Sequence, residues 1–555
     1  MPAPRVLIIG MDGATFRVID PLIEEGKLPH LARLLRGGLR ANLLSTIPYH
    51  TSAAWPTFLT GLHPGSHGIF NFDEMSAGGY GAGARLVTSA AIAGRTFLDV
   101  AGKAGLRVAA VRIPMTYPAW PVNGALVSGY PSPERGAYVY PRAMAERVPG
   151  MRDPSDAPDP DARARLLLDE VSRTTEIACH ILATDHPDLC AVVYQQSDVA
   201  HHWFWRYMDP ASPAYSPDEA ARYGDVIARV YAAIDEGIGA LLRHADAATR
   251  VMVLSDHGGT LGPSQQFHIN AWLAAEGLLA RREPSAAAKA YALRRYVLPP
   301  AARARLKRIV NRVLPRTAAD AAELLYFNLQ DVAWERTQAF RFAVTAEVEG
   351  IRLNVAGRER HGIVAPGAEQ DALRERLIAR LAALRAPLDG APLVRAIYRR
   401  EELYTGERAG GAPDLILLLH PAYRGGRELN GPLFSAVPMD ELRRNHGGWH
   451  EPEGILIAHG PGIAHGTLES ARLLDMAPTV LGMVGLPAAP WMEGAALREV
   501  AGATIAPLAS VASRSQVRDE PVPTATSANA SRAAVPLTPD EEESVRERLR
   551  SLGYL

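Results

Sequence analysis

The sequence places side chains that could bind metal ions directly after several apolar runs. Asp12 follows the first of these runs, and Asp256 with His257 follows the run Val251–Leu254. Runs of this length are typical of buried strands, and open α/β sheets bind ligands at the carboxyl ends of their strands. The two glycines after His257 permit the turn that would aim consecutive side chains at one ion. Taken alone, each segment also fits a plain turn or loop cap.

A second pattern pairs a carboxylate with an imidazole at helical spacing. Asp198 and His202 lie four residues apart, shortly after the apolar run Cys190–Tyr194. One turn of helix would bring both side chains to the same face. An oxygen and a nitrogen ligand at this spacing suit zinc, although an Asp–His pair is also a common hydrogen-bonded pair.

A glycine-rich stretch before the apolar run Ile455–Ala458 holds two further histidines, His446 and His450. A histidine in such a loop is also compatible with polar surface. Several separate clusters of carboxylates and imidazoles at expected sheet edges are difficult to explain without metal ions. The sequence therefore predicts a metal centre.

Thr51 offers a hydroxyl next to this expected centre. It precedes a helix-compatible stretch that runs to about Gly61. Backbone N–H groups at a helix N-terminus favour negative charge, so a hydroxyl there suits attack on a phosphoryl group. The alternative, that Thr51 or Ser52 only caps the helix, stays open at this point.

Together these segments resemble the type I phosphodiesterase/nucleotide pyrophosphatase family of the alkaline phosphatase superfamily. The matching segments are Gly10-Met-Asp-Gly13, Thr51 with Thr60-Gly-Leu62, His67-Gly-Ile69, Asp198 with His202, Ser255-Asp-His-Gly258, Gly448-Trp-His450, Leu474-Asp-Met-Ala-Pro-Thr479 and Arg548–Tyr554. The resemblance implies two divalent metal ions and sorts the ligands into two sets. Asp198, His202 and His450 would hold one ion, and Asp12, Asp256, His257 and Thr51 would hold the other. Zinc suits this mixed N/O set, and manganese or iron would also be compatible with it.

The resemblance also implies a reaction. Thr51 would attack phosphorus and form a phospho-threonine intermediate, which water would then hydrolyse. Asn71 is the nearest match to an asparagine that donates to the phosphoryl oxygen in relatives. We favour His450 over His446 as the loop ligand because the Gly-x-His-x-Pro-x-Gly pattern around His450 resembles that of bacterial relatives.

A threonine nucleophile resembles the diesterase branch, which implies small phosphodiester, nucleotide-like or pyrophosphate substrates. One alternative is a phosphomonoester or phosphonate hydrolase, or a phosphomutase-like enzyme, on the same scaffold. Another is a degenerate, non-catalytic scaffold protein, since a fold alone does not establish an activity. Sulfatases of the same superfamily need a Cys-x-Pro/Ala-x-Arg context, and neither Cys179 nor Cys190 has it.

The elements that must position these residues alternate between apolar runs and helical stretches. Further runs of strand length lie at Val108–Val111 and Leu415–Leu419. This alternation predicts an α/β fold with a mostly parallel central sheet and helices on both faces. The resemblance implies the alkaline-phosphatase-like version of that fold. We also expect an α+β cap region to be inserted within the core.

We expect the catalytic core in residues 1–262 and 411–500, and the inserted cap region in residues 263–410. Within the cap region we expect helices at Ala286–Arg316 and Asp371–Leu384 and a strand at Gly350–Val355. Residues 501–536 have the composition of a flexible linker. A C-terminal helix is expected within 537–555.

Two segments could contact partners. Residues 284–319 contain many arginines and no acidic residue, with a dense group at 294–316; this fits a solvated helix face, an anionic partner or a membrane surface. Thr538, Pro539 and Glu541 predict a capped helix, which Val545, Leu549 and Leu552 would give one apolar face. That helix could dock on its own domain or form an oligomer or partner contact.

The composition is that of a globular protein. The chain has 555 residues, 47% of them hydrophobic, and a formal net charge of −1, so global charge points to no clear nucleic-acid binding. No run reaches the roughly 18 apolar residues that a transmembrane segment needs. Because the first residues also lack a signal-peptide pattern, we expect a cytoplasmic protein.

Overall fold

The centre of the molecule is a nine-stranded sheet in the order β18-β2-β17-β7-β1-β6-β3-β4-β5. The computed structural model describes residues 3–74, 85–154, 157–282, 332–444, 447–502 and 537–552. Across the sheet, the strands are β18 (Gly466–Arg472), β2 (Leu39–Leu44), β17 (Glu453–His459), β7 (Arg250–Leu254), β1 (Val6–Met11), β6 (Leu189–Tyr194), β3 (Val108–Ile113), β4 (Gly124–Ser128) and β5 (Val139–Tyr140). Strands β17 and β5 run antiparallel to their neighbours and the other pairs are parallel, so the mostly parallel sheet predicted from the sequence is confirmed.

The three central strands end at the same level. Gly10 of β1 lies opposite Val193 of β6 and Leu254 of β7. Every residue of β1 and β6 is buried, as expected for parallel strands that are covered on both faces. The segments that follow these strands therefore leave the sheet side by side, at its carboxyl edge.

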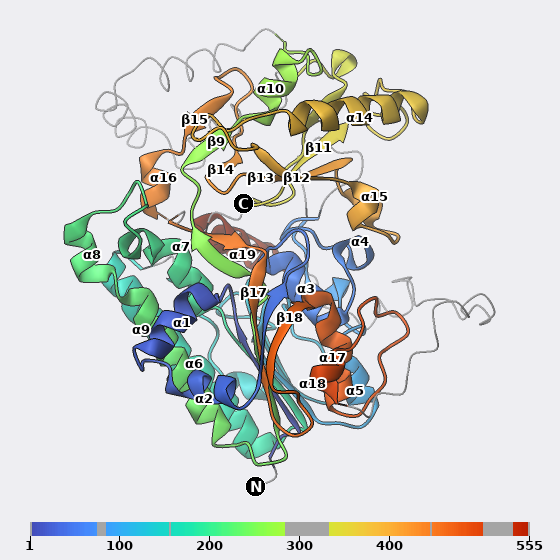
Figure 1. The fold of residues 1–555 in the computed structure, drawn as a ribbon. Helices are drawn as coiled ribbons and strands as arrows, with labels where there is room; N and C mark the ends of the chain where they lie inside the picture. The colour runs from blue at the N-terminus through green and yellow to red at the C-terminus, as the bar shows by residue number, and fades with distance from the viewer. Residues whose placement is uncertain are drawn as a thin grey trace, which may run out of the picture.

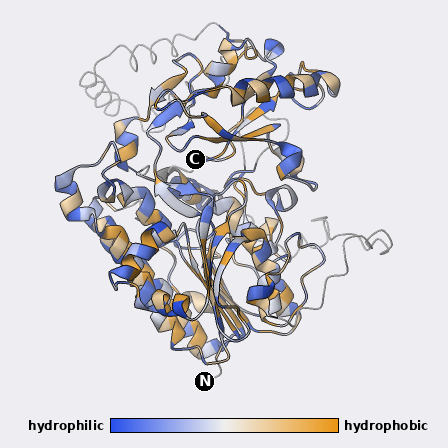
Figure 2. Ribbon diagram, in the orientation of Figure 1, coloured by the Kyte–Doolittle hydropathy of each residue, from blue (hydrophilic) through white to orange (hydrophobic). Residues whose placement is uncertain are grey.

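Helices cover both faces of the sheet (Figure 1). One face carries α1 (Phe16–Glu24), α2 (Pro29–Arg36), α6 (Pro160–Asp185) and α9 (Val226–Leu242), and the other carries α3 (Thr51–Thr60), α5 (Phe97–Lys103), α17 (Met476–Met483) and α18 (Arg498–Ala501). Helix α9 shows why they pack there, because it buries Val230, Ile234, Ile238 and Leu241 at a spacing of three or four residues. Figure 2 shows the result, with apolar strands enclosed between helices of mixed hydropathy.

A second α+β unit lies beyond the carboxyl edge of the sheet (Figure 1). Its elements are β9 (Gln265–Phe267), α10 (Ile269–Ala275), β10 (Ala339–Arg341), β11 (Glu349–Leu353), α14 (Ala368–Ala382), β12 (Val394–Arg399), α15 (Arg400–Leu403), β13 (Leu415–Leu419), β14 (Tyr423–Gly425), β15 (Phe434–Ala436) and α16 (Met439–Arg444). Strands β10-β11-β13-β12 form an antiparallel sheet, and β14-β9-β15 form a smaller one. This unit has an apolar cluster of its own around Trp272, Phe340 and Leu377. It is the cap region, and its expected strand and second helix are present as β11 and α14.

The apolar run Leu415–Leu419 lies in the cap region and not in the central sheet. As β13, it pairs with β11 and β12. Strands β14 and β15 also belong to this unit because they pair with β9. An apolar run indicates burial but not which sheet buries it. We therefore propose that the cap region extends past the expected boundary at 410, to about residue 447, where β16 (Gly448–Glu451) begins.

The C-terminal helix α19 (Pro539–Leu552) docks on the core of its own chain. Glu541 N donates to Thr538 Oγ1 (3.3 Å), and Thr538 N donates to Glu541 Oε2 (2.9 Å), which is the predicted capping box. Val545 and Leu549 are buried in the core, and Tyr117 donates its hydroxyl hydrogen to Glu541 (2.7 Å). The helix expected at Ala286–Arg316 and nearly all of the expected linker lie outside the described residues.

None of the described helices combines the length and the apolar character needed to cross a membrane.

Candidate metal centre

Asp12 lies directly after β1 and is fully buried. Trp55 of α3 donates its indole N–H to Asp12 Oδ2 (2.9 Å), and Ser197 donates its hydroxyl hydrogen to the Asp12 backbone carbonyl (2.7 Å). These contacts hold the other carboxylate oxygen toward Thr51, whose Oγ1 lies 3.4 Å from Asp12 Oδ1. Two residues of α3 thus orient the carboxylate, and Ser197 anchors the backbone behind it.

Thr51 is the first residue of α3 and is also fully buried. The helix begins here because the side chain of His50 accepts a hydrogen bond from Ser52 N, as an N-cap residue does. Thr51 Oγ1 lies 3.3 Å from His257 Nε2. The hydroxyl therefore lies between a carboxylate and an imidazole, at the positive end of a helix dipole.

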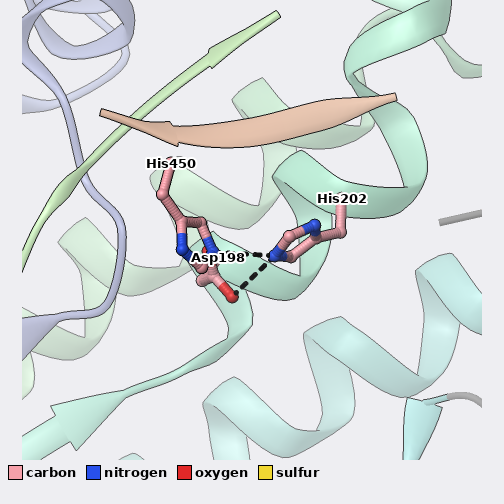
Figure 3. A group of neighbouring side chains, drawn as sticks. All are labelled: Asp198, His202 and His450. Atoms are coloured by element: carbon pink, nitrogen blue, oxygen red, sulfur yellow. Dashed lines mark hydrogen bonds and ion pairs between the residues drawn. The ribbon is translucent and has the colours of Figure 1, made fainter. Parts of the chain in front are cut away.

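Asp198 and His202 lie on α7 (Gln196–Met208), one turn apart, as their spacing predicted. His202 Nε2 is 3.4 Å from Asp198 Oδ2. His450 approaches from β16, with its Nε2 3.3 Å from Asp198 Oδ1 and 3.0 Å from His202 Nε2 (Figure 3). Three buried ligand atoms from two distant segments thus converge on one point.

Asp256 and His257 follow β7, and both are fully buried. Gly13 N donates to Asp256 Oδ1 (3.2 Å), and His257 Nε2 lies 3.3 Å from Asp256 Oδ2 and 3.6 Å from Asp12 Oδ1. His257 Nδ1 lies 3.1 Å from the carbonyl oxygen of Gly258. A hydrogen on Nδ1 that donates to this carbonyl leaves the Nε2 lone pair facing the carboxylates.

These residues form two groups of ligand atoms with Asp198 in common. One group is Asp198, His202 and His450, and the other is Asp12, Asp198 and His257; within each group all ligand atoms lie within 4.8 Å of one another. The resemblance places Asp198 in one ligand set, and in the structure its carboxylate belongs to both groups of ligand atoms. The two groups therefore form one continuous centre.

The carboxylates of the centre are buried and close together, which changes their pKa values. Burial, followed by the neighbouring carboxylates Asp256 and Asp198, raises the pKa of Asp12 well above its usual value. Burial and then Asp198 raise the pKa of Asp256 to about 7. Burial also acts on Asp198, but the imidazoles of His202 and His450 outweigh it and hold the pKa of Asp198 well below its usual value. Divalent cations would offset this crowding of buried carboxylates, so the residues fit metal binding.

The comparison with protein families decides the classification. A sequence profile described as type I phosphodiesterase / nucleotide pyrophosphatase matches residues 6–451, which include every candidate ligand. The chain belongs to this family.

Solved structures provide a second comparison. Human ectonucleotide pyrophosphatase / phosphodiesterase 5 is 14% identical, with a TM-score of 0.45, and the match covers 88% of this chain and 97% of that one. Phosphonoacetate hydrolase from Sinorhizobium meliloti, solved in complex with phosphonoacetate, is 16% identical, with a TM-score of 0.47 and coverages of 86% and 94%. No curated protein matches the sequence. The family assignment makes the chain a hydrolase that acts on phosphoric ester bonds.

One further histidine of this type I phosphodiesterase-family chain has a partner outside the centre. His201, next to His202, faces away from it, and its Nε2 lies 3.0 Å from the hydroxyl oxygen of Tyr231. His446 lies outside the described residues, so the choice of His450 as the loop ligand stays a prediction.

Asn71 has a structural contact of its own. Its amide group donates to the carbonyl oxygen of Val344 in the cap region (3.0 Å), and its Oδ1 accepts from Phe72 N (2.8 Å). The first of these contacts joins the core to the cap region. The expected role of Asn71 toward a phosphoryl oxygen stays a prediction.

The sequence interpretation missed Trp55 and Glu347. Trp55 orients Asp12, and its position one helical turn after Thr51 is the only local signal of that role. Glu347 reaches the centre from the cap region, with its Oε1 3.2 Å from Nδ1 of His450. No local pattern marks Glu347, because a distant element brings it to the site.

Proposed function

We propose that the protein is a two-metal phosphohydrolase that cleaves phosphodiester or pyrophosphate bonds through a phospho-threonine intermediate on Thr51. The observation that carries this proposal is the position of Thr51 Oγ1, 3.4 Å from Asp12 Oδ1 and 3.3 Å from His257 Nε2. A hydroxyl held among candidate metal ligands at a helix N-terminus has the surroundings that a nucleophile toward phosphorus needs.

Asp198, His202 and His450 would hold one divalent ion, and Asp12, Asp256, His257 and Thr51 would hold the other. When bound, such ions lower the pKa of a coordinated hydroxyl and balance the charge that develops on phosphoryl oxygens. Zinc suits the mixed nitrogen and oxygen donors, and manganese or iron would be compatible with them.

The side chains of the protein orient Thr51 Oγ1 for its attack on phosphorus. The Thr51 hydroxyl donates to Asp12, which fixes the direction of Oγ1. As the Thr51 hydroxyl gives up its proton to Asp12, the Oγ1–phosphorus bond forms and the bond from phosphorus to the leaving oxygen breaks, so the phosphoryl group then resides on Thr51. The N-terminus of α3 stabilises its negative charge. Water hydrolyses the phospho-threonine and restores the hydroxyl.

Purified protein tests the proposal in two measurements. Elemental analysis is expected to find two transition-metal ions per chain, and bis(p-nitrophenyl) phosphate is expected to be hydrolysed faster than p-nitrophenyl phosphate. A preference for the monoester, or hydrolysis of phosphonoacetate alone, would replace the diesterase assignment by one of the alternatives on the same scaffold. Protein without metal and without activity would indicate a binding or scaffold role.

A further inference from the structure

The loop between β10 and β11 carries a carboxylate from the cap region to the metal centre. The loop turns tightly, because Val344 N and Thr345 N both donate to Val348 O (3.0 and 3.1 Å). Glu347 lies in this turn, and its side chain is 1% exposed. The loop thus directs an acidic group into the protein interior.

Apolar contacts and one amide already seat this loop on the core. Val344 and Val348 pack in a cluster with Tyr49 and Phe70 of the core. The amide group of Asn71 donates to the carbonyl oxygen of Val344. Seating the loop therefore does not need a charge, and a buried carboxylate destabilises a protein unless it is paired. The position of Glu347 calls for another explanation.

One neighbour of Glu347 is the outer nitrogen of a candidate metal ligand, and Thr345 and His50 are others. Glu347 Oε1 lies 3.2 Å from His450 Nδ1. The other ring nitrogen, Nε2, faces Asp198 Oδ1 at 3.3 Å and His202 Nε2 at 3.0 Å. The two nitrogens of one imidazole thus have distinct partners, a carboxylate outside the centre and the ligand group inside it.

We propose that Glu347 is a positioning residue of the metal centre, and that it accepts the Nδ1 hydrogen of His450 so that the Nε2 lone pair faces the ion. The inference rests on the proposed function, since it assigns His450 as a ligand. A carboxylate behind a ligand histidine fixes the tautomer and the ring orientation of the imidazole. It also makes Nε2 a stronger electron-pair donor to the ion. Glu347 comes from the cap region, so correct seating of the cap completes the metal centre of the core.

Metal affinity of the full chain, measured by competition with a chromogenic chelator, tests the role of Glu347. Glu347→Ala should lower the affinity for one of the two ions by about 10- to 100-fold. Glu347→Gln should weaken it less, because the amide oxygen can still accept from Nδ1. Wild-type affinities in both variants would overturn the proposal, and Glu347→Gln, which keeps the size of the side chain, allows the test even if Glu347→Ala does not fold.

Glu349→Gln is the matched control. Glu349 lies in the same hairpin and is equally buried, but it pairs with Arg341 inside the cap region (2.6 Å). Its loss should lower the stability of the protein, yet both metal affinities should stay at the wild-type values. An equal loss of affinity in Glu349→Gln would show that any damage to the cap region weakens binding, and the specific role of Glu347 would then be wrong.

His450→Ala separates this inference from the proposed function. If His450→Ala retains both ions with wild-type affinity, the ligand assignment fails and the role of Glu347 fails with it. If His450→Ala loses one ion while Glu347→Ala keeps both at wild-type affinity, the ligand assignment stands and only the role of Glu347 is refuted.

Discussion

The neighbouring hydroxyls Thr51 and Ser52 have different surroundings. Thr51 Oγ1 faces Asp12 and His257, whereas Ser52 Oγ lies 2.7 Å from Nδ1 of His50, which caps the helix. Only Thr51 therefore lies among the candidate ligands. We expect Thr51→Ala to retain both ions, because six side-chain ligands remain, and to lower kcat by at least about 1,000-fold, as loss of a nucleophile does.

Steady-state kinetics and elemental analysis on Thr51→Ala and Ser52→Ala check this prediction. Ser52→Ala should keep most of the turnover, since it removes a contact of the helix cap and not a reacting atom. The nucleophile assignment would be wrong if Thr51→Ala turned over normally while Ser52→Ala did not.

The adjacent histidines of α7 provide a sharper test of the ligand set. His202 faces Asp198 and His450, and His201 faces Tyr231 on α9. We expect His202→Ala to bind about one ion fewer per chain, because a tetrahedral site cannot close without it. His201→Ala should keep both ions, although it loses a buried hydrogen bond. Metal content after extensive dialysis distinguishes the two variants, and equal losses would contradict the assignment.

At the scale of elements, α19 provides a prediction about stability. Leu549 is fully buried in the core, while Glu547 on the same helix is exposed. Leu549→Ala should lower the free energy of unfolding by about 2–5 kcal/mol, the usual range for a buried leucine. Glu547→Ala should change it by less than about 0.5 kcal/mol. Urea unfolding of both variants measures the difference, and similar midpoints would mean that α19 does not dock on the core.

Sequence patterns predicted the features that depend only on residues close together in the chain. Asp198 and His202 share a face of α7 because helical spacing alone brings them together. The run Leu415–Leu419 was correctly predicted as a strand, but its pairing with β11 and β12 depends on residues far away in the sequence. Sheet membership was therefore not predictable from that run.

The approach of His450 to the centre illustrates the same limit. Strand β16 pairs with β8 (Gly258–Leu261), and His450 lies opposite Gly259 in that ladder. The pairing stacks the ring of His450 on that of His257, with centroids 3.9 Å apart. The sequence pointed to His450 only through its resemblance to a family, because no spacing rule connects residues so far apart. Glu347 lacked even that signal.

At the scale of the whole molecule, the core and the cap region have separate apolar clusters, and a small third cluster joins them. Tyr49 and Phe70 from the core pack there with Val344 and Tyr404 from the cap region. The hydroxyl of Tyr404 also donates to the carbonyl oxygen of Ile47 (2.7 Å). The two units therefore meet next to the metal centre, where the cap region contributes Glu347.

The position of β17 has a consequence for the order in which the protein can fold during synthesis. Strand β2 is made early, yet both of its neighbours, β17 and β18, come from residues after 452. One edge of strand β7 also stays unpaired until β17 is made. Until the ribosome has passed these residues, the nascent chain has two strands with unpaired edges, which are prone to aggregate and to recruit chaperones. A chain ending at residue 451 contains Thr51 and every candidate ligand, but we expect it to be protease-sensitive and inactive. A chain ending at residue 502 keeps all nine strands and should resist limited proteolysis; equal resistance of the two would show that the sheet can form without its last strands.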